Sequence, residues 1–368
     1  MSAVVTLNPV PPRSYRLGVM LGDGIGPEIV PAAVRVVDAA LAAVGSASAD
    51  WQELPLGASA IEQHGSAIPP ATLEALAGLD GWLLGPHDSA AYPEPFRSQL
   101  NPSGAIRKHF DLYANVRPAR GLGGGTAIAP DTDLVVVREN TEGFYADRNT
   151  HAGTGEYMPT PDVAVCMGVF TRPAVERIAR AAFELARRRR RRVTIVHKAN
   201  VLQLSSGLFK RVCLEVAEGY PDVAVDDVHI DAMTVHLLRR AHDFDVVVAE
   251  NMFGDILSDL AGELAGSLGI APSVNASDDR CMAQAAHGSA PDIAGRGLAN
   301  PVAMILSAGM LLDWLGRRHG DERALDAAAR VEEGVRAAVS DGVCTRDLGG
   351  TASTGEFAAA VVDRVAGR

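Results

Sequence analysis

The stretch "YRLGVMLGDGIGPEIVPAAVRVVDAALAAVG", residues 15–45, decides the predicted fold class. It reads as a short apolar strand, a glycine-rich turn and a helix, since apolar side chains recur at helical spacing from Ile29 to Leu41. Later apolar strands alternate with helical patterns such as residues 173–190 and 203–219. This alternation is typical of a mostly parallel sheet that helices cover on both faces, and it predicts an α/β fold. The later strands are "GWLLG" (81–85), "DLVVVREN" (133–140), "RVTIVHK" (192–198) and "FDVVVAEN" (244–251).

The length and charge of the chain exclude some classes of function. At 368 residues it is too long for one simple core, so we expect two domains. It has 34 Lys and Arg against 45 Asp and Glu, a formal net charge of −11, which disfavours a nucleic-acid partner. No apolar run approaches the roughly 20 residues of a membrane helix, and the N-terminus lacks the pattern of a secretion signal. The 4 cysteines form no C-x-x-C pair and fit reduced thiols, so we expect a cytoplasmic protein.

The run of arginines at residues 187–192 allows two interpretations. It resembles a nucleic-acid-binding tail, but it directly follows a helical pattern and precedes a strand. Cations at the C-terminus of a helix interact favourably with the helix dipole. We therefore expect a solvated helix end here, and no nucleic-acid partner.

Two aspartates in "ENMFGDILSDLAGEL", residues 250–264, indicate a metal site. On a helix, Asp255 and Asp259 lie on one face, where like charges weaken the helix by about a few tenths of a kcal/mol. Carboxylate oxygens collected in this way are what Mg²⁺ or Mn²⁺ requires, and a bound cation would cancel the repulsion. The alternative is a solvated acidic stripe, although the apolar neighbours argue against full exposure of this helix.

Three arginines form a candidate substrate clamp. Arg138 ends an apolar strand, and Arg107 and Arg117 lie in "GAIRKHFDLYANVRPAR", residues 104–120. Guanidiniums at strand ends of an α/β protein face the crevice where ligands bind, and three of them can hold a di- or tricarboxylate through paired hydrogen bonds. A surface ion pair explains any one of them equally well. Tyr145, seven residues after Arg138, favours the functional interpretation.

Four further features have both a structural and a functional interpretation. Lys198 follows an apolar strand, where a lysine is usually solvated but can act as a base if its neighbours favour the neutral amine. Asp231 precedes a helical pattern and by itself predicts an N-cap. The turn "GDGIGPE" (22–28) has the spacing G-x-G-x-G, which is not the fingerprint of a dinucleotide site. The loop "HGSAPDIAGRGLANP" (287–301) either connects two elements or wraps a ligand with its backbone.

These blocks, in this order and over nearly the whole chain, resemble the β-decarboxylating dehydrogenases, the isocitrate/isopropylmalate dehydrogenase family that includes homoisocitrate and tartrate dehydrogenases. The motifs that carry the resemblance are "GDGIGPE", "NVRP", "VRENTEG", "HKANVL", "GDILSDL" and "HGSAPDIAGRGLANP". The resemblance implies an oxidoreductase that acts on the CH–OH group of a 3-substituted malate, with NAD as acceptor and Mg²⁺ or Mn²⁺ as metal. It also implies two domains built on a mostly parallel sheet flanked by helices.

The resemblance further implies domain boundaries and an assembly. Residues 1–113 and 266–368 would form the larger, cofactor-binding domain, and residues 114–265 the smaller domain with the dimer interface. Residues from about 146 to 165, which are polar and bear Gly and Pro, would form an arm that clasps the partner subunit. We therefore expect a homodimer with shared active sites.

The resemblance assigns roles to the candidate site. Substrate binding would use Arg107, Arg117 and Arg138, which hold the malate portion common to all substrates of the family. Tyr145 would protonate the enol after CO₂ leaves, and Lys198 would take part in removing the proton of the C2 hydroxyl. The metal ligands would be Asp231, Asp255 and Asp259, of which Asp231 is also counted with the catalytic residues. In the family, Lys198 and Asp231 reach into the active site of the partner subunit.

The loop 287–301 resembles the adenosine-binding loop of the family. Asp292 would bind the ribose hydroxyls and Asn300 would lie near adenine. An acidic side chain repels a 2′-phosphate, so we expect NAD as the cofactor, although Arg296 in the same loop offers a phosphate a partner. The expected cofactor-binding residues are Ile25, Asn200, His287, Gly288, Ser289, Ala290, Asp292 and Asn300.

The positions before Arg107 bear on the substituent of the malate. Isopropylmalate enzymes resemble one another in two leucines that stand three and four positions before this arginine, where this chain has Gly104 and Ser103. The apolar pocket is absent, and one lost contact of this kind costs about 1–3 kcal/mol of discrimination. Isocitrate enzymes place a serine and an asparagine at six and four positions before it; this chain has Asn101 and Ser103. Together with Glu142 in "ENTEG", these residues favour isocitrate or homoisocitrate.

Three alternatives stay open at this point. Leu100 or Ile106 can supply an apolar pocket and make the chain a 3-isopropylmalate dehydrogenase of leucine biosynthesis. Tartrate or D-malate is a second possible substrate class. An inactive regulatory subunit is the third, although every motif position is filled here.

Overall fold

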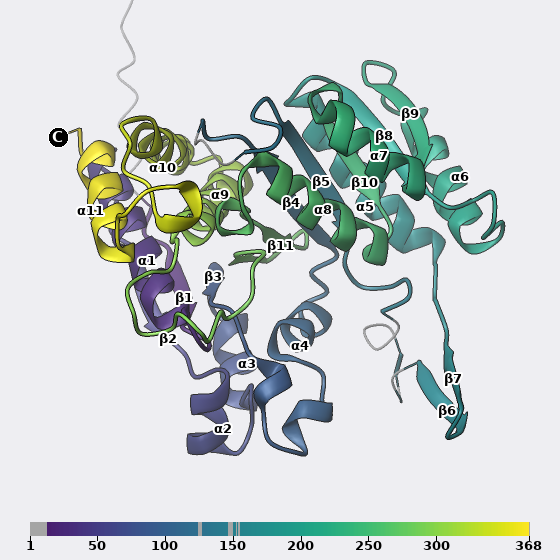
Figure 1. Cartoon of the computed structure of the whole chain (residues 1–368), viewed down its shortest axis with the longest axis horizontal. Helices are drawn as coiled ribbons and strands as arrows, with labels where there is room; N and C mark the ends of the chain where they lie inside the picture. Colours follow the sequence, from purple (N-terminus) through teal and green to yellow (C-terminus); the bar gives the residue numbers. More distant parts are fainter. Residues whose placement is uncertain (1–12, 124–126, 146–149, 152, 154, 368) are drawn as a thin grey trace, which may run out of the picture.

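The computed structural model describes residues 13–123, 127–145, 150–151, 153 and 155–367. In this part of the chain, one large sheet has the strand order β2-β1-β3-β12-β11-β4-β5-β10-β8-β9, and β6 and β7 form a separate hairpin (Figure 1). The strands are β1 Arg16–Met20, β2 Asp50–Glu53, β3 Gly81–Leu84, β4 Ala114–Arg120, β5 Asp133–Glu139, β6 Glu156–Thr160, β7 Val163–Cys166, β8 Arg192–His197, β9 Ala224–His229, β10 Val246–Ala249, β11 Val274–Ala276 and β12 Cys281–Gln284.

Helices surround the sheet on both faces, which confirms the predicted α/β fold. The helices are α1 Gly26–Ala43, α2 Ala58–His64, α3 Pro70–Ala77, α4 Pro102–His109, α5 Arg172–Arg187, α6 Ser205–Ala217, α7 Ile230–Arg240, α8 Asn251–Ala265, α9 Val302–His319, α10 Glu322–Ser340 and α11 Thr354–Val365. The helical patterns expected at 173–190 and 203–219 correspond to α5 and α6, which end slightly earlier than the patterns.

Two parallel blocks of strands run in opposite directions within the large sheet. Strands β2, β1, β3 and β12 are parallel to one another, and so are β5, β10, β8 and β9. Strand β11 pairs antiparallel with β12 and β4, and β4 pairs antiparallel with β5. The sequence did not predict β4, because Arg117, Pro118 and Arg120 interrupt its apolar pattern.

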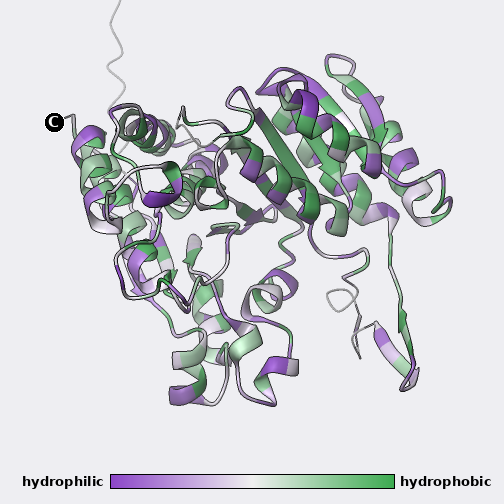
Figure 2. Ribbon diagram, viewed as in Figure 1, coloured by the Kyte–Doolittle hydropathy of each residue, from purple (hydrophilic) through white to green (hydrophobic). Residues whose placement is uncertain are grey.

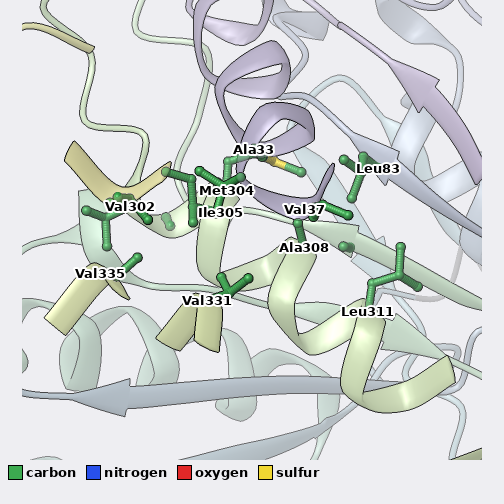
Figure 3. Packing of buried hydrophobic residues seen from close by; sticks show 14 of the residues in the cluster. Ala33, Val37, Leu83, Val302, Met304, Ile305, Ala308, Leu311, Val331 and Val335 are labelled. Atoms are coloured by element: carbon green, nitrogen blue, oxygen red, sulfur yellow. The ribbon is translucent and has the colours of Figure 1, made fainter. Parts of the chain in front are cut away.

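The largest apolar cluster holds α1, α9, α10 and α11 together. Ala33 and Val37 of α1 meet Ile305 and Ala308 of α9, and Val331 of α10 closes the group (Figure 3). All five side chains are at most 2% exposed, as expected for apolar residues at helical spacing. The periodicity that predicted α1 from the sequence therefore marks its buried face.

Two other clusters lie on the two faces of the β5-β10-β8 block, whose strands are mostly hydrophobic (Figure 2). Helices α5 and α6 cover one face through Ile178, Phe183 and Phe209. Helices α7 and α8 cover the other through Met233 and Leu257. Helix α8, which carries the two aspartates of interest, is thereby anchored by its apolar side.

The residues of the four apolar clusters fall into two groups along the sequence, with boundaries near residues 113 and 266. Two of them draw almost all their buried members from residues 15–112 and 270–365, and the other two lie within 114–265. This distribution supports the division into 1–113 with 266–368 and 114–265, which stays a prediction.

Part of the expected arm lies outside the described residues, namely residues 146–149, 152 and 154. The described part contains the antiparallel hairpin β6–β7, which extends away from the rest of the chain (Figure 1). Tyr157, Met158 and Val163 are 55%, 63% and 45% exposed on it. Large apolar side chains exposed in a row are typical of a surface that meets another protein.

Among the described residues, we find no helix that is both long and apolar enough to cross a membrane.

Candidate active site

Arg138 stands at the centre of a polar site at the end of β5. Its side chain is 2% exposed, so its charge needs partners within the protein. Nε and Nη2 donate to Oδ1 of Asn251 at 3.0 and 2.7 Å, and Nη1 pairs with Asp255. The N-terminal part of α8 thus supplies two partners of this buried guanidinium.

Arg117 reaches the same helix from the neighbouring strand β4. Its Nε donates to Oδ1 of Asn115 at 2.5 Å, and its Nη1 donates to Oγ of Ser258 at 2.8 Å. The same Nη1 lies 3.2 Å from an Oδ1 of both Asp255 and Asp259. Two guanidiniums and two carboxylates therefore meet between β4, β5 and α8.

Asp255 and Asp259 lie one turn apart on α8, and both face these arginines. Burial raises the pKa of Asp255, but the charges of Arg138 and Arg117 outweigh burial and hold that pKa below its ordinary value. Burial and the neighbouring Asp255 raise the pKa of Asp259 despite the attraction of Arg117. The positive charges of the arginines thus offset the negative charge of Asp255 more fully than that of Asp259.

Tyr145 joins the group through both its hydroxyl and its ring. The hydroxyl donates to Oδ2 of Asp255 at 3.2 Å. The ring centroid lies 5.7 Å from the guanidinium carbon of Arg138, within the range of a cation–π contact. The phenol is therefore held within the arginine and aspartate cluster.

Arg107 lies on α4 and is buried. Its Nη2 donates to Oε1 of Gln284 at 3.2 Å, and its Nη1 donates to Oδ1 of Asn140 at 3.4 Å. Ser103, also buried, donates its hydroxyl to the same Gln284 oxygen at 2.9 Å. Asn101 caps α4, because its Oδ1 accepts from the backbone N–H of Gly104 at 2.8 Å.

Lys198 and Asp231 form a separate pair, in which Nζ lies 2.6 Å from Oδ1. Asp231 lies in the first turn of α7, and its side chain is 69% exposed. Within the described part of the chain, no hydrogen bond or ion pair joins this pair to the arginine cluster, and no three His, Cys, Asp or Glu side chains are grouped to hold a metal ion. One chain thus brings Asp255 and Asp259 together but leaves Asp231 apart.

The glycine turn 22–28 touches the loop 287–301 directly. The backbone N–H of Ile25 donates to the carbonyl of Ser289 at 2.9 Å. Gly24 has a φ of +59°, and a Cβ at this position would stand 2.0 Å from the same carbonyl oxygen. Only glycine permits this approach, so the two motifs form one surface.

Glu28, the last residue of the turn, fixes the far end of the loop. Its carboxylate accepts from the backbone N–H of Gly295 at 2.6 Å and from that of Gly297 at 2.8 Å. These two hydrogen bonds therefore fix the distance between the loop backbone and α1.

The remaining residues expected to bind the cofactor differ in their burial and in their contacts. His287 Nδ1 lies 3.0 Å from the carbonyl of Gly288, and burial lowers the pKa of this histidine. Asn300 donates to Asp347 at 2.9 Å and is buried, whereas Asp292 is exposed on the loop. Ala290 has a positive φ of 39°. Asn200, which follows β8, is exposed, and no contact joins it to this loop in the described residues.

Sequence reasoning missed the amide side chains that hold the arginines. Both "VVVREN" and "VVVAEN" place an asparagine just after a buried strand, and these are Asn140 and Asn251, the partners of Arg107 and Arg138. The repeated Glu-Asn at two strand ends is a signal that points to them. Gln284 and Glu28 carry no such signal, because their partners are distant in the sequence.

Fold and site together define an α/β enzyme that has two features: a glycine turn joined to a long loop, and a cluster of arginines and carboxylates suited to an acidic substrate. Known proteins agree with this class. The family model described as isocitrate/isopropylmalate dehydrogenase matches residues 16–361, and the chain belongs to this family and is an oxidoreductase.

The chain is similar over nearly its whole length to several members of the family. It is 43% identical to the isocitrate/homoisocitrate dehydrogenase of Thermus thermophilus, covering 95% of this chain and 98% of that protein. It is 39% identical to the 3-isopropylmalate/3-methylmalate dehydrogenase of Methanocaldococcus jannaschii, covering 95% and 99%. The crystal structure of isocitrate dehydrogenase from Methylococcus capsulatus superimposes with a TM-score of 0.83 at 40% identity, covering 95% of this chain and 99% of that one.

Proposed function

We propose that this chain catalyses the oxidative decarboxylation of a 3-substituted malate, with isocitrate or homoisocitrate as the preferred substrate, NAD as the oxidant and Mg²⁺ or Mn²⁺ as the metal. One observation carries the proposal: Arg117 and Arg138 converge on Asp255, with Asp259 and Tyr145 beside them. The cluster presents cations for the carboxylates of the substrate and anions for a metal in one place.

The arginines bind and orient the substrate in this proposal. Guanidiniums hold carboxylates through paired, charge-assisted hydrogen bonds. Arg107, Arg117 and Arg138 are each 8% exposed or less, and their amide partners fix their direction. A substrate held in this way loses little further entropy before reaction.

Two side chains move protons. Lys198 takes part in removing the proton of the C2 hydroxyl. NAD, when bound, would supply the acceptor for the hydride of C2, so that the alcohol becomes an oxo acid. The carboxylate beta to the new carbonyl departs as CO₂, its bonding electrons forming an enolate. Tyr145 then delivers a proton to C3.

The residues present fit a divalent metal. Mg²⁺ is usually bound by one or two protein carboxylates, with substrate oxygens and waters completing the shell, and Asp255 and Asp259 supply two carboxylates on one helix face. Asp255 pairs with both Arg117 and Arg138, whereas Asp259 pairs with Arg117 alone, so the second carboxylate is less fully compensated. When bound, the metal polarises the C2 oxygen and withdraws electrons during decarboxylation.

The polar surroundings of Arg107 support isocitrate or homoisocitrate. Ser103 and Gln284 place a hydroxyl and an amide beside this arginine. Ile106 is 0% exposed within the cluster that contains Trp82, so it faces the core and offers no apolar wall to a substrate. Of the residues considered for isopropylmalate, only Leu100 is left, and it packs against Gly104.

We also propose a homodimer with shared active sites. The exposed apolar side chains of the β6–β7 hairpin and the separation of the Lys198–Asp231 pair from the arginines both support an active site completed by a partner subunit. Cys166, Cys213, Cys281 and Cys344 are free thiols, in keeping with a cytoplasmic location.

Initial rates test the proposal. Isocitrate, homoisocitrate, 3-isopropylmalate, tartrate and malate are each assayed with NAD and with NADP in the presence of Mg²⁺ or Mn²⁺. We expect NADH and CO₂ to form together, with the highest kcat/KM for isocitrate or homoisocitrate. A highest kcat/KM for isopropylmalate overturns the substrate assignment, and no reduced cofactor from any substrate overturns the proposed activity.

A further inference from the structure

A groove lies on the face of the sheet opposite the arginine cluster. It encloses about 970 Å³, at the upper end of the roughly 300–1,000 Å³ typical of small-molecule sites. Val116 and Pro118 of β4 line it, whereas Asn115 and Arg117 of the same strand face the active site. Successive side chains of a strand point to opposite faces, so the thickness of the sheet separates the groove from the catalytic residues.

The floor of the groove is apolar. Leu185 of α5 lines one wall, Met310 and Trp314 of α9 line the other, and Val274 of β11 lies between them. Helices from two distant parts of the sequence thus form a surface that favours an apolar or aromatic body.

One residue of the arginine run 187–192 differs from its neighbours. Those with carboxylate partners are Arg187 with Asp222, Arg189 with Asp133 and Asp245, Arg190 with Asp133 and Asp245, and Arg192 with Asp226. Within the described part of the chain, the side chain of Arg188 has neither a hydrogen bond nor an ion pair, and it lines the groove. The run begins at the end of α5, and Arg187, Arg188, Arg190 and Arg191 are exposed, which agrees with the expected solvated helix end.

A second guanidinium enters the groove from the other wall. Arg317 of α9 pairs with Asp313, at 2.7 Å from Nε to Oδ2 and 2.8 Å from Nη2 to Oδ1. Burial and the charge of Arg317 lower the pKa of Arg188, and the charges of Asp313 and Glu184 offset only part of this effect. Two like charges that face one apolar groove repel each other, and an anion between them reverses the sign of the interaction.

The other acidic groups of the groove are already engaged. Glu332 pairs with Arg120, and Asp278 accepts the hydroxyl of Tyr113 at 2.8 Å. Asp133 pairs with Arg189 at 2.9 Å. Glu184, which also lines the groove, lies 3.6 Å from Arg187. Among the arginines that line the groove in the described residues, Arg188, which is exposed, is thus the one without an ion pair.

We propose that this groove binds an amphipathic organic monocarboxylate, with the carboxylate held between Arg188 and Arg317 and the apolar body against Met310 and Trp314. A single carboxylate matches the single guanidinium of the lining that has no ion pair in the described residues. A phosphate monoester carries about −1.5 to −2 at neutral pH and would leave excess negative charge beside Asp313. The site is independent of the proposed reaction.

Dansylglycine tests the proposal, because it joins an aromatic body to one carboxylate and its fluorescence increases in apolar surroundings. Dansylglycinamide has the same body without the charge. We expect saturable binding of the acid to the assembled full-length protein. Dansylglycinamide should bind the wild type at least tenfold more weakly than dansylglycine does. Dansylglycine should bind Arg188→Gln at least tenfold more weakly than it binds the wild type, because each change removes a charge-assisted hydrogen bond. Met310→Trp, which narrows the groove from the wall formed by α9, removes the fluorescence increase.

Arg191→Gln is the matched control. Arg191 belongs to the same run and, in the described residues, forms no ion pair, but it does not line the groove. We expect its affinity for dansylglycine to equal that of the wild type. Equal affinities in Arg188→Gln and the wild type, or equal affinities for the acid and the amide, overturn the proposal. So does the absence of any saturable fluorescence increase, which is the outcome if a second copy of the chain covers the groove.

Discussion

Gly254 lies directly against Arg138: a Cβ at position 254 would stand 2.7 Å from both Cβ and Cγ of the arginine. Gly254 is buried in the first turn of α8, between Asn251 and Asp255, which bind this guanidinium. The helix therefore approaches Arg138 closely enough to bind it only because residue 254 has no side chain.

Gly254→Ala tests this relationship. Alanine normally stabilises a helix interior by about 0.5–1 kcal/mol relative to glycine, but here the new methyl group must displace Arg138. We expect kcat/KM for isocitrate to fall by tenfold or more, with a thermal midpoint no higher than that of the wild type. Gly207→Ala on α6 is the control, because the nearest atom to its Cβ is 3.9 Å away. Wild-type kinetics in Gly254→Ala would show that the position of Arg138 is not critical.

Glu28→Ala tests the link between the glycine turn and the loop 287–301. The variant leaves the N–H groups of Gly295 and Gly297 without their carboxylate acceptor, so the loop loses its fixed distance from α1. We expect KM for NAD to rise by about tenfold, equivalent to ~1.4 kcal/mol, with KM for isocitrate nearly unchanged. Glu74→Ala, on the exposed side of α3, should change neither constant. An equal rise in both KM values contradicts the assignment of this loop to the cofactor.

Glu250→Gln tests the pH dependence of stability. Burial raises the pKa of Glu250 to about 7, above the ordinary value of 4.5, so the folded state binds this proton more tightly than the unfolded state. The stabilisation from protonated Glu250 is complete below about pH 4.5 and is lost as the pH rises through 7. Glutamine keeps a neutral partner for Ser206 at every pH.

Urea denaturation at pH 5 and pH 8.5 measures this effect. Relative to the variant, the wild type should lose on the order of 3 kcal/mol of unfolding free energy between the two values. Glu62→Gln, an exposed glutamate on α2, should show the wild-type pH dependence. A parallel pH dependence in the wild type and Glu250→Gln would refute the proton uptake at this carboxyl.

Hybrid dimers test the shared active site. Lys198→Ala and Arg138→Gln should each be nearly inactive alone. In a dimer that contains one chain of each kind, one site receives an intact arginine from one chain and an intact lysine from the other. Random mixing makes half of the dimers hybrid, so we expect co-expression to restore about a quarter of the wild-type activity. Activity no greater than the sum of the two variants means that each chain builds its site alone.

The elements with strong apolar patterns were predictable from the sequence, and those that meet the substrate were less so. Strands β3, β5, β8 and β10 are buried runs of Val, Ile and Leu, and they lie where the sequence predicted strands. Strands β4, β11 and β12 escaped prediction, since two are very short and β4 directs Asn115 and Arg117 into a polar site. Functional residues interrupt the same pattern that reveals a strand.

The residues of the candidate site also include some that were predictable from the sequence and some that were not. Asp255 and Asp259 were recognisable because a helical spacing of like charges needs an explanation. The contacts of Arg107 with Gln284 and of Glu28 with Gly295 join residues more than 170 positions apart, and only the folded chain brings them together. The unpaired Arg188 was hidden for another reason, because its neighbours in the run are also arginines and only their partners distinguish them.

Binding of Mn²⁺ tests the central claim most directly. Free Mn²⁺ gives a six-line paramagnetic resonance signal that is lost on binding, so a titration in the presence of isocitrate reports affinity without turnover. We predict that the wild type binds Mn²⁺, and that Asp255→Asn weakens binding by tenfold or more, because a carboxylate ligand is lost. The control Glu263→Gln, an exposed position on the same helix, should bind as the wild type does. Equal affinity for Mn²⁺ in Asp255→Asn and the wild type would contradict the account.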